Sequence, residues 1–159
     1  ATKMPDIQFV WAGNFAFKGI SEGRKEIMEH MDDLPDNVHF LGLVERDRMN
    51  EFFNMGDVML QLSFEELFPM TILESMNANI PLLLRDLPEY KPILFDYYLK
   101  ANSQQTFKDE LTKLKEDADY YAKACEGSKR GEQFYSKESI LEQWQQFYDK
   151  VATERNLLS

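Results

Sequence analysis

The sequence has little of what secreted, membrane-spanning or metal-binding proteins require. Its single cysteine, Cys125, rules out an internal disulfide and fits a reducing compartment. No apolar run approaches the roughly 20 residues of a membrane-spanning helix, and Ala1–Met4 has no feature of a signal peptide. The two histidines, His30 and His39, have no further ligand at metal-binding spacing, so we interpret them as surface or strand residues.

Basic residues are also in the minority. The chain has 18 Lys and Arg against 28 Asp and Glu, which gives a net charge of −10 and a pI of about 4.7. Such a surface repels phosphate backbones, so the charge argues against nucleic-acid binding and against a basic membrane-docking face. A composition of 43% hydrophobic and 29% charged residues is typical of a globular protein.

The length suits one domain with a single core, and we predict one domain over residues 1–159. The chain does not begin with Met and opens almost directly into an apolar run. We therefore expect it to be a fragment of a longer protein.

Strand-like and helix-like patterns alternate along the first part of the chain. Short β-branched and apolar runs predict strands over 7–12, 38–41, 58–62 and 81–84, separated by a loop at 13–19 and helices from 21, over 46–55 and over 69–76. This alternation is typical of an α/β fold with a Rossmann-like, doubly wound parallel sheet. Three amphipathic helices follow over 107–114, 120–125 and 140–151, with polar links near 117 and 127–131.

The loop after the third predicted strand is the best candidate for a binding site. Parallel sheets bind ligands at the carboxyl ends of their strands, where loops lead into helix amino ends. Here the loop 63–68 leads into a helix that begins near Pro69, a residue favoured in a first turn. The first N–H groups of that helix have no partner within it, so they favour an anion such as a diphosphate. Asn79 would end the helix in the left-handed conformation.

Two carboxylates lie on either side of this helix start. Glu74 is about one turn inside the helix and leans back toward its amino end, whereas Glu66 belongs to the preceding loop. An anion site between two acceptors of hydroxyl hydrogen bonds is what a sugar nucleotide requires. The alternative is that Glu66 is merely solvated and Glu74 satisfies backbone N–H groups, and spacing alone favours this alternative.

The segment 66–81, ELFPMTILESMNANIP, resembles the E-x7-E motif of retaining GT-B glycosyltransferases of the family-four type. The consensus of that motif in the family is roughly E-x-F-P-x-x-x-L-E-A-M-A-x-G-x-P. Further stretches agree in order and spacing: 9–13 resembles the hydrophobic strand and glycine before the donor site, 37–44 resembles V-x-F-L-G-x-V, and 56–58 stands where A-D-V is usual. The resemblance covers residues 6–94, outweighs the alternative, and implies the C-terminal, donor-binding half of a GT-B fold.

The resemblance also implies roles for individual residues. Glu66 would contact the donor sugar's hydroxyls and help to hold the oxocarbenium geometry, and Glu74 would bind the ribose. Glu65 lies nine positions from Glu74 where the motif requires eight, so the catalytic role goes to Glu66. Backbone groups along the sugar and diphosphate are expected from Phe68, Pro69, Met70 and Thr71. The residues expected to border the nucleotide base are Val44, Glu45 and Arg46. Gly13 would let the first loop approach the ligand closely.

The expected partners are a nucleotide sugar and an N-terminal acceptor domain. We expect that this sequence lacks both that acceptor domain and the first strand of the donor-binding half. The resemblance implies no metal or other cofactor, and the sequence has no Asp-x-Asp pair to hold a metal. The basic residues that neutralise the diphosphate in the family precede the strand at residue 7, so they are absent from this sequence. Asn79 replaces the family's usual glycine, which its role as a helix cap tolerates.

A finer resemblance concerns residues 83–90, LLRDLPEY, which are similar to V-L-x-R-D-I-P-x-Y in Gram-positive glucosyltransferases that make glucosyl-diacylglycerols. It implies transfer of glucose from UDP-glucose to diacylglycerol, in the cytoplasm at the inner face of the cell membrane. Arg85 and Asp86 could equally form a local ion pair that caps the next helix.

Other interpretations remain open. The chain could be a noncatalytic GT-B-like partner or assembly protein, a polysaccharide-building glycosyltransferase, or a nucleotide-sugar epimerase, although the F-P and L-E-S-M pattern fits an epimerase poorly.

Cys125 has no nearby basic pair to activate it as a nucleophile. The aromatic residues Trp144, Phe147 and Tyr148 have helical spacing and are interpreted mainly as core packing, with part of the stripe in an interdomain contact.

We predict that this chain alone binds its nucleotide sugar weakly and does not turn it over. Without the family's basic residues, the helix end is the main anion site, and such an end contributes only about 0.3–1 kcal/mol when exposed. Calorimetric titration with a UDP-sugar tests this expectation, and a micromolar affinity would overturn it.

Overall fold

The structure, a computed structural model, describes residues 1–14, 29 and 31–154. The helix predicted from residue 21 and most of the predicted loop 13–19 lie outside the described residues. The chain divides into two compact units, Ala1–Phe52 and Phe53–Ser159. The boundary falls within helix α2 (Met49–Met55).

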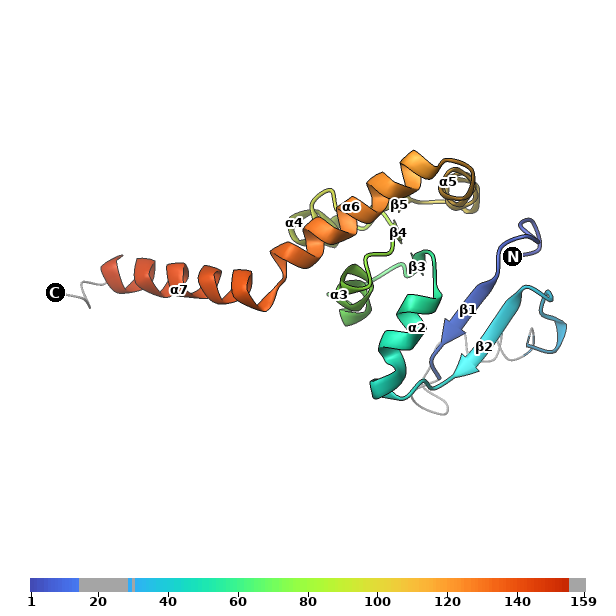
Figure 1. Cartoon of the computed structure of the whole chain (residues 1–159), viewed down its shortest axis with the longest axis horizontal. Coiled ribbons are helices and arrows are strands. Elements are labelled where there is room, and N and C mark those ends of the chain that lie inside the picture. The colour runs from blue at the N-terminus through green and yellow to red at the C-terminus, as the bar shows by residue number, and fades with distance from the viewer. Residues whose placement is uncertain (15–28, 30, 155–159) are drawn as a thin grey trace. The chain divides into compact units, whose positions relative to one another are not determined.

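The first unit contains a two-stranded parallel sheet of β1 (Phe9–Ala12) and β2 (Val38–Gly42), which confirms both predicted strands (Figure 1). A short 3-10 turn, η1 (Met31–Asp33), precedes β2, and another, η2 (Arg46–Arg48), leads into α2. The Asn37 side chain is buried and donates to the carbonyls of Met4 at 2.9 Å and Ile7 at 2.7 Å. This side chain therefore fixes the segment that enters β1.

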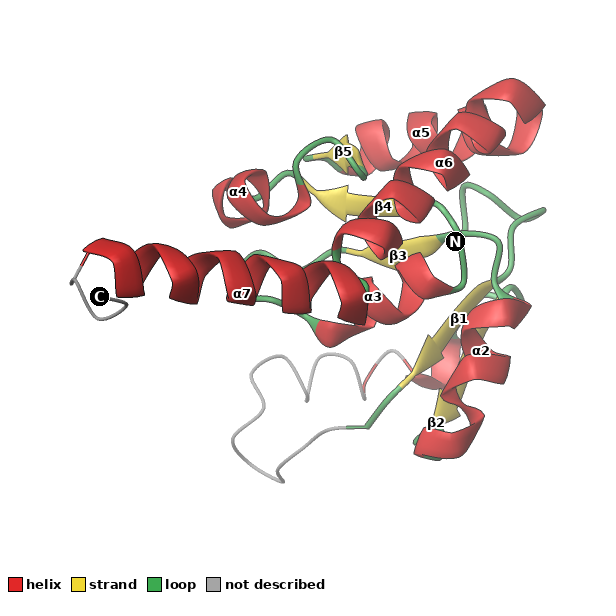
Figure 2. Ribbon diagram, turned by 60° about the vertical axis from the view of Figure 1, so that its left-hand side comes forward, coloured by secondary structure: helices red, strands yellow, loops and turns green. Residues whose placement is uncertain are grey.

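The second unit contains a three-stranded parallel sheet in which β4 (Leu82–Arg85) lies between β3 (Met59–Gln61) and β5 (Leu99–Ala101) (Figure 2). The three leucines of β4 are at most 1% exposed. Because successive side chains point to opposite faces, β4 is covered on both faces, as a parallel strand requires. The sequence predicted β3 and β4 but not β5.

Helices of the second unit follow the strands. They are α3 (Met70–Asn77), η3 (Pro88–Tyr90), α4 (Lys91–Leu94), α5 (Gln104–Glu116), α6 (Ala118–Phe134) and α7 (Lys137–Glu154). A core cluster joins the α3 side chains Ile72 and Met76 to Leu82 and Leu84 of β4 and to Tyr90. Helix α3 therefore covers the face of the sheet to which Leu82 and Leu84 point.

The prediction that the second C-terminal helix ends at Cys125 is wrong, because α6 continues through the expected link at 127–131. Both glycines of this stretch are buried against neighbouring elements. A Cβ on Gly131 would lie 2.6 Å from the Met76 side chain, and one on Gly127 would lie 3.2 Å from the Tyr97 carbonyl oxygen. Here glycine permits close helix packing rather than ending the helix.

The carboxyl end of α3 has the predicted cap. Asn79 has a φ of 56°, in the left-handed region. Its N–H donates to the Met76 carbonyl at 2.9 Å, and the N–H of Ile80 donates to the Ser75 carbonyl at 3.4 Å, which is a Schellman arrangement. The Ile80 carbonyl in turn accepts from the buried Ser128 hydroxyl of α6 at 2.6 Å.

Helix α7 differs from its prediction. It projects beyond α6 (Figure 1), and none of its residues is buried. The side chains of Trp144, Phe147 and Tyr148 are 53%, 53% and 60% exposed and pack on one another, with the Trp144 and Tyr148 rings stacked at 5.6 Å. The interpretation of this stripe as core packing is therefore wrong, because no residue of α7 is buried in the core of the second unit.

We predict that Ser128→Ala lowers the free energy of unfolding by about 1–3 kcal/mol, because it leaves the buried Ile80 carbonyl without a donor. Denaturant unfolding of the chain measures this change. Thr153→Ala is the matched control, since it removes an exposed hydroxyl that bonds within α7. A Ser128→Ala chain as stable as the control would contradict the assigned role of this bond.

Candidate functional site

The loop from Leu62 to Phe68 joins the carboxyl end of β3 to α3, as predicted. Pro69 is the N-cap, with φ −69° and ψ 123°, so the helix begins at Met70, one residue later than predicted. No side chain caps this end. The N–H of Ile72 donates to the Pro69 carbonyl at 3.0 Å, so the N–H groups of Met70 and Thr71 are the ones available to an anionic ligand.

The Glu66 carboxylate is held at this edge of the sheet. Its Oε1 accepts a 2.6 Å hydrogen bond from Nε2 of Gln61, which also donates to the Ser63 hydroxyl at 2.9 Å. Gln61 pairs in register with Leu84, so the two side chains point to the same face of the sheet. Since Leu84 lies in the cluster with α3, Glu66 is anchored on the face that α3 covers.

Glu74 lies on α3 and is exposed. Within the described part of the chain its carboxylate has no hydrogen bond or ion pair, so it does not satisfy backbone N–H groups there. The carboxylate can therefore accept from the hydroxyl groups of a ligand.

The remaining predicted contacts of this segment differ in burial. Phe68 is half-buried and packs on the Tyr135 ring at 5.6 Å, which anchors the loop. Pro69 and Thr71 are also half-buried, whereas Met70 is exposed. Their predicted backbone contacts with the sugar and diphosphate stay predictions.

Arg85, at the end of β4, forms hydrogen bonds to the residues that follow the ends of β3 and β5. Its Nε donates to the Leu62 carbonyl at 3.0 Å, its Nη1 donates to the Asn102 carbonyl at 3.1 Å, and its guanidinium lies 3.9 Å from the centre of the Phe64 ring. These contacts fix the start of the loop that carries Glu66.

Asp86 does not pair with Arg85 in this arrangement. It lies 3.8 Å from the Lys100 ammonium and accepts from the Tyr98 hydroxyl at 3.4 Å. Neighbouring residues of an extended chain point to opposite sides, which separates the two side chains. The interpretation of Arg85 and Asp86 as a local ion pair is thus not what the structure shows.

Gly13, Val44 and Arg46 belong to the first unit. Gly13 follows β1 with a φ of 142°, and its N–H donates to the Gly42 carbonyl at 2.7 Å. Val44 is half-buried and follows β2, whereas Arg46 is exposed and begins η2. All three therefore follow carboxyl ends of the same parallel sheet. Their contacts with a base or phosphate stay predictions.

Sequence reasoning missed Gln61 and the role of Arg85. No motif marks Gln61, and the similarity at 83–90 includes Arg85 without showing its contacts, because each residue acts through the pairing of strand ends that are distant in sequence. An amide or guanidinium at the last position of a predicted parallel strand is the one signal that could have drawn attention to them.

The described residues support neither thiol nor metal chemistry. Burial raises the pKa of the Cys125 thiol, so this residue is protonated at neutral pH and is no thiolate nucleophile. No group of three His, Cys, Asp or Glu side chains there could hold a metal ion. No helix in the described ranges is both long and apolar enough to cross a bilayer.

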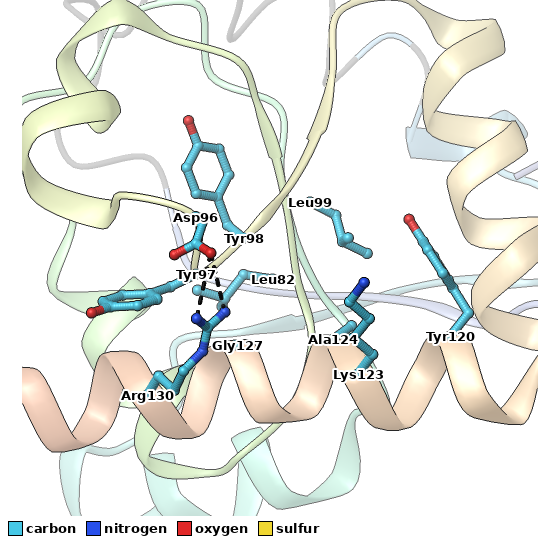
Figure 3. A pocket seen from close by; sticks show the side chains of 10 residues that line it. All are labelled: Leu82, Asp96, Tyr97, Tyr98, Leu99, Tyr120, Lys123, Ala124, Gly127 and Arg130. Carbon is cyan, nitrogen blue, oxygen red and sulfur yellow. Dashed lines mark hydrogen bonds and ion pairs between the residues drawn. The ribbon is translucent and has the colours of Figure 1, made fainter.

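A pocket of about 290 Å³ lies at the other edge of the second unit's sheet (Figure 3). Leu82 and Leu99, which begin β4 and β5, line it, so it opens at the amino ends of these strands. Arg130 points toward Asp96 across this pocket and pairs with it at 3.4 Å. The pocket is therefore separate from the loop that carries Glu66.

Comparison with solved structures gives the fold. The chain is similar to Anabaena HepE in complex with UDP-glucose, with a TM-score of 0.72 and 15% identity over 96% of this chain and 43% of that one. It is also similar to sucrose-phosphate synthase from Thermosynechococcus elongatus, with a TM-score of 0.74 and 17% identity over 96% of this chain and 41% of that one. These likenesses confirm the predicted α/β, Rossmann-like half of a GT-B fold.

Comparison with curated proteins finds two relatives whose names describe glycolipid synthesis. The chain is 36% identical over 152 residues to alpha-galactosylglucosyldiacylglycerol synthase of Streptococcus pneumoniae, covering 96% of this chain and 41% of that protein. It is 28% identical over 116 residues to the processive diacylglycerol alpha-glucosyltransferase of Acholeplasma laidlawii, covering 72% of this chain and 34% of that protein. The chain thus spans less than half the length of either relative. Residues 1–131 match the family described as glycosyl transferases group 1, and the chain belongs to that family.

Proposed function

We propose that this chain is the donor-binding part of a longer retaining hexosyltransferase that takes glucose from UDP-glucose. The observation that carries this proposal is the arrangement around α3. The uncapped helix start follows Glu66, whose carboxylate Gln61 holds, and precedes Glu74, whose carboxylate has no partner among the described residues. An anion site between two hydroxyl acceptors suits a sugar diphosphate nucleotide.

Each part of this arrangement has a distinct task in the proposed reaction. The N–H groups at the start of α3 bind the diphosphate, and Glu74 accepts hydrogen bonds from the ribose hydroxyls. Glu66 accepts from hexose hydroxyls, and its charge lies near the anomeric carbon as the bond to the phosphate oxygen breaks. Because positive charge develops there only in the transition state, Glu66 accelerates the transfer itself rather than ground-state binding alone.

We further propose that the acceptor is diacylglycerol, in glycolipid synthesis at the inner face of the cell membrane. The names of the two curated relatives support this acceptor. The net charge of −10 disfavours contact of this chain itself with an anionic membrane. The acceptor and the membrane would then be bound by an N-terminal domain that precedes this chain in the longer enzyme.

Two other functions give different results in one assay. A noncatalytic GT-B-like partner would have no need to hold Glu66 with Gln61, so the 2.6 Å bond disfavours it. A polysaccharide-building enzyme would use the same donor site with a sugar acceptor. Assaying the longer enzyme with UDP-glucose and either diacylglycerol or oligosaccharide acceptors separates all three.

We predict that in this enzyme Glu66→Ala lowers kcat at least 100-fold, because it removes a charge complementary to the transition state. Glu74→Ala should chiefly raise the KM for UDP-glucose, because it removes ribose contacts present in ground and transition states alike.

Glu65→Ala is the matched control for both variants, since Glu65 is an exposed carboxylate of the same loop. It should retain wild-type kinetics. Near-normal activity of both the Glu66→Ala and Glu74→Ala enzymes would show that the site is assigned wrongly.

We also propose that the transfer needs no metal ion, as the family resemblance implies. The initial rate should be the same before and after dialysis against EDTA, measured by UDP release. Loss of activity that magnesium or manganese restores would overturn this part of the proposal.

A further inference from the structure

Tyr90 has a buried hydroxyl with no hydrogen-bond partner. The side chain is 0% exposed, and its hydroxyl is the single buried side-chain polar atom without a partner in the part of the chain that the structure describes. The ring is well packed, edge-on to Tyr98 at 5.8 Å. Leaving a buried donor unsatisfied costs stability, and native proteins rarely do so.

The location of Tyr90 points to Glu66. Tyr90 ends η3, which follows the carboxyl end of β4, and Glu66 follows the carboxyl end of the adjacent strand β3. Both lie on one face of the sheet: Tyr90 packs in the cluster with Leu84, and Glu66 is held by Gln61, whose side chain points to the same face as Leu84.

The electrostatics agree with this location. Burial raises the pKa of Tyr90 to about 12, and the negative charges of Glu66 and then Glu89 add to the effect. The hydroxyl is therefore protonated at neutral pH and can act only as a donor to a carboxylate. Glu89 is exposed, whereas Glu66 is half-buried and has one oxygen, Oε2, without a hydrogen bond in the described structure.

We propose that Tyr90 is a positioning residue whose hydroxyl donates to Oε2 of Glu66 when the donor sugar is bound. The carboxylate would then be held through both oxygens, by the Gln61 amide and the Tyr90 hydroxyl, with lone pairs left on each oxygen for the sugar. Because Tyr90 is fully buried, it acts through Glu66 and does not touch the substrate. This inference rests on the proposed function of Glu66.

The test is Tyr90→Phe in the longer enzyme, which keeps the packed ring and removes only the hydroxyl. We expect a melting temperature equal to or above that of the wild type, because an unsatisfied donor is gone. Affinity for UDP, which lacks the hexose, should be unchanged. The kcat with UDP-glucose should fall about tenfold, as expected for loss of one hydrogen bond to a charged group.

A double-mutant cycle shows whether the effect passes through Glu66. If it does, Tyr90→Phe should cause no further loss of kcat in an enzyme that already carries Glu66→Ala. Equal fractional losses in both backgrounds would overturn the proposal.

Tyr98→Phe is the matched control. Tyr98 belongs to the same buried cluster, but its hydroxyl donates to Asp86 and not toward Glu66. It should leave kcat unchanged. Wild-type kcat in Tyr90→Phe, or an equal loss in Tyr98→Phe, would contradict the positioning role. Full activity of Glu66→Ala would instead reject the proposed function, so the two failures are distinguishable.

Discussion

The position of α3 in the second unit depends on its close contact with α6. An eight-residue helix is too short to be stable by itself, so tertiary contacts must hold it in place. Gly131 lets α6 approach the Met76 side chain, and the Ser128 hydroxyl binds the carbonyl of Ile80 just beyond the Asn79 cap. This contact fixes the carboxyl end of α3, and therefore the direction in which its uncapped amino end points.

The opposite end of α3 is fixed from the sheet. Arg85 holds the Leu62 carbonyl where the loop begins, and Phe68 packs on Tyr135 where it ends. Between these two anchors Gln61 holds Glu66. The loop is thus ordered at its ends and at its one half-buried carboxylate, which is the kind of pre-organisation that a site complementary to a transition state requires.

The sequence predicted those parts of the fold that depend on local pattern. The strands at 38–41, 58–62 and 81–84 are apolar runs with turn residues beside them, and Asn79 is a cap that spacing alone reveals. The elements that the sequence predicted wrongly, or not at all, depend on contacts between residues distant in the chain. Strand β5 is three residues long with an exposed lysine at its centre, and the glycines of α6 were interpreted as a link because glycine suits both a turn and a tight helix contact.

The candidate site divides in the same way. Glu66 and Glu74 stand out by their motif, whereas the roles of Gln61, Arg85 and Tyr90 emerge only from the order of strands β3, β4 and β5. We propose above all that the segment from Leu62 to Asn77 binds the donor. Hydrogen–deuterium exchange of the longer enzyme with and without UDP-glucose tests it most directly. We expect UDP-glucose to slow exchange at the amides of 62–77 and to leave α6 unchanged. Slower exchange confined to α6 and the pocket beside Arg130, with 62–77 unaffected, would contradict it.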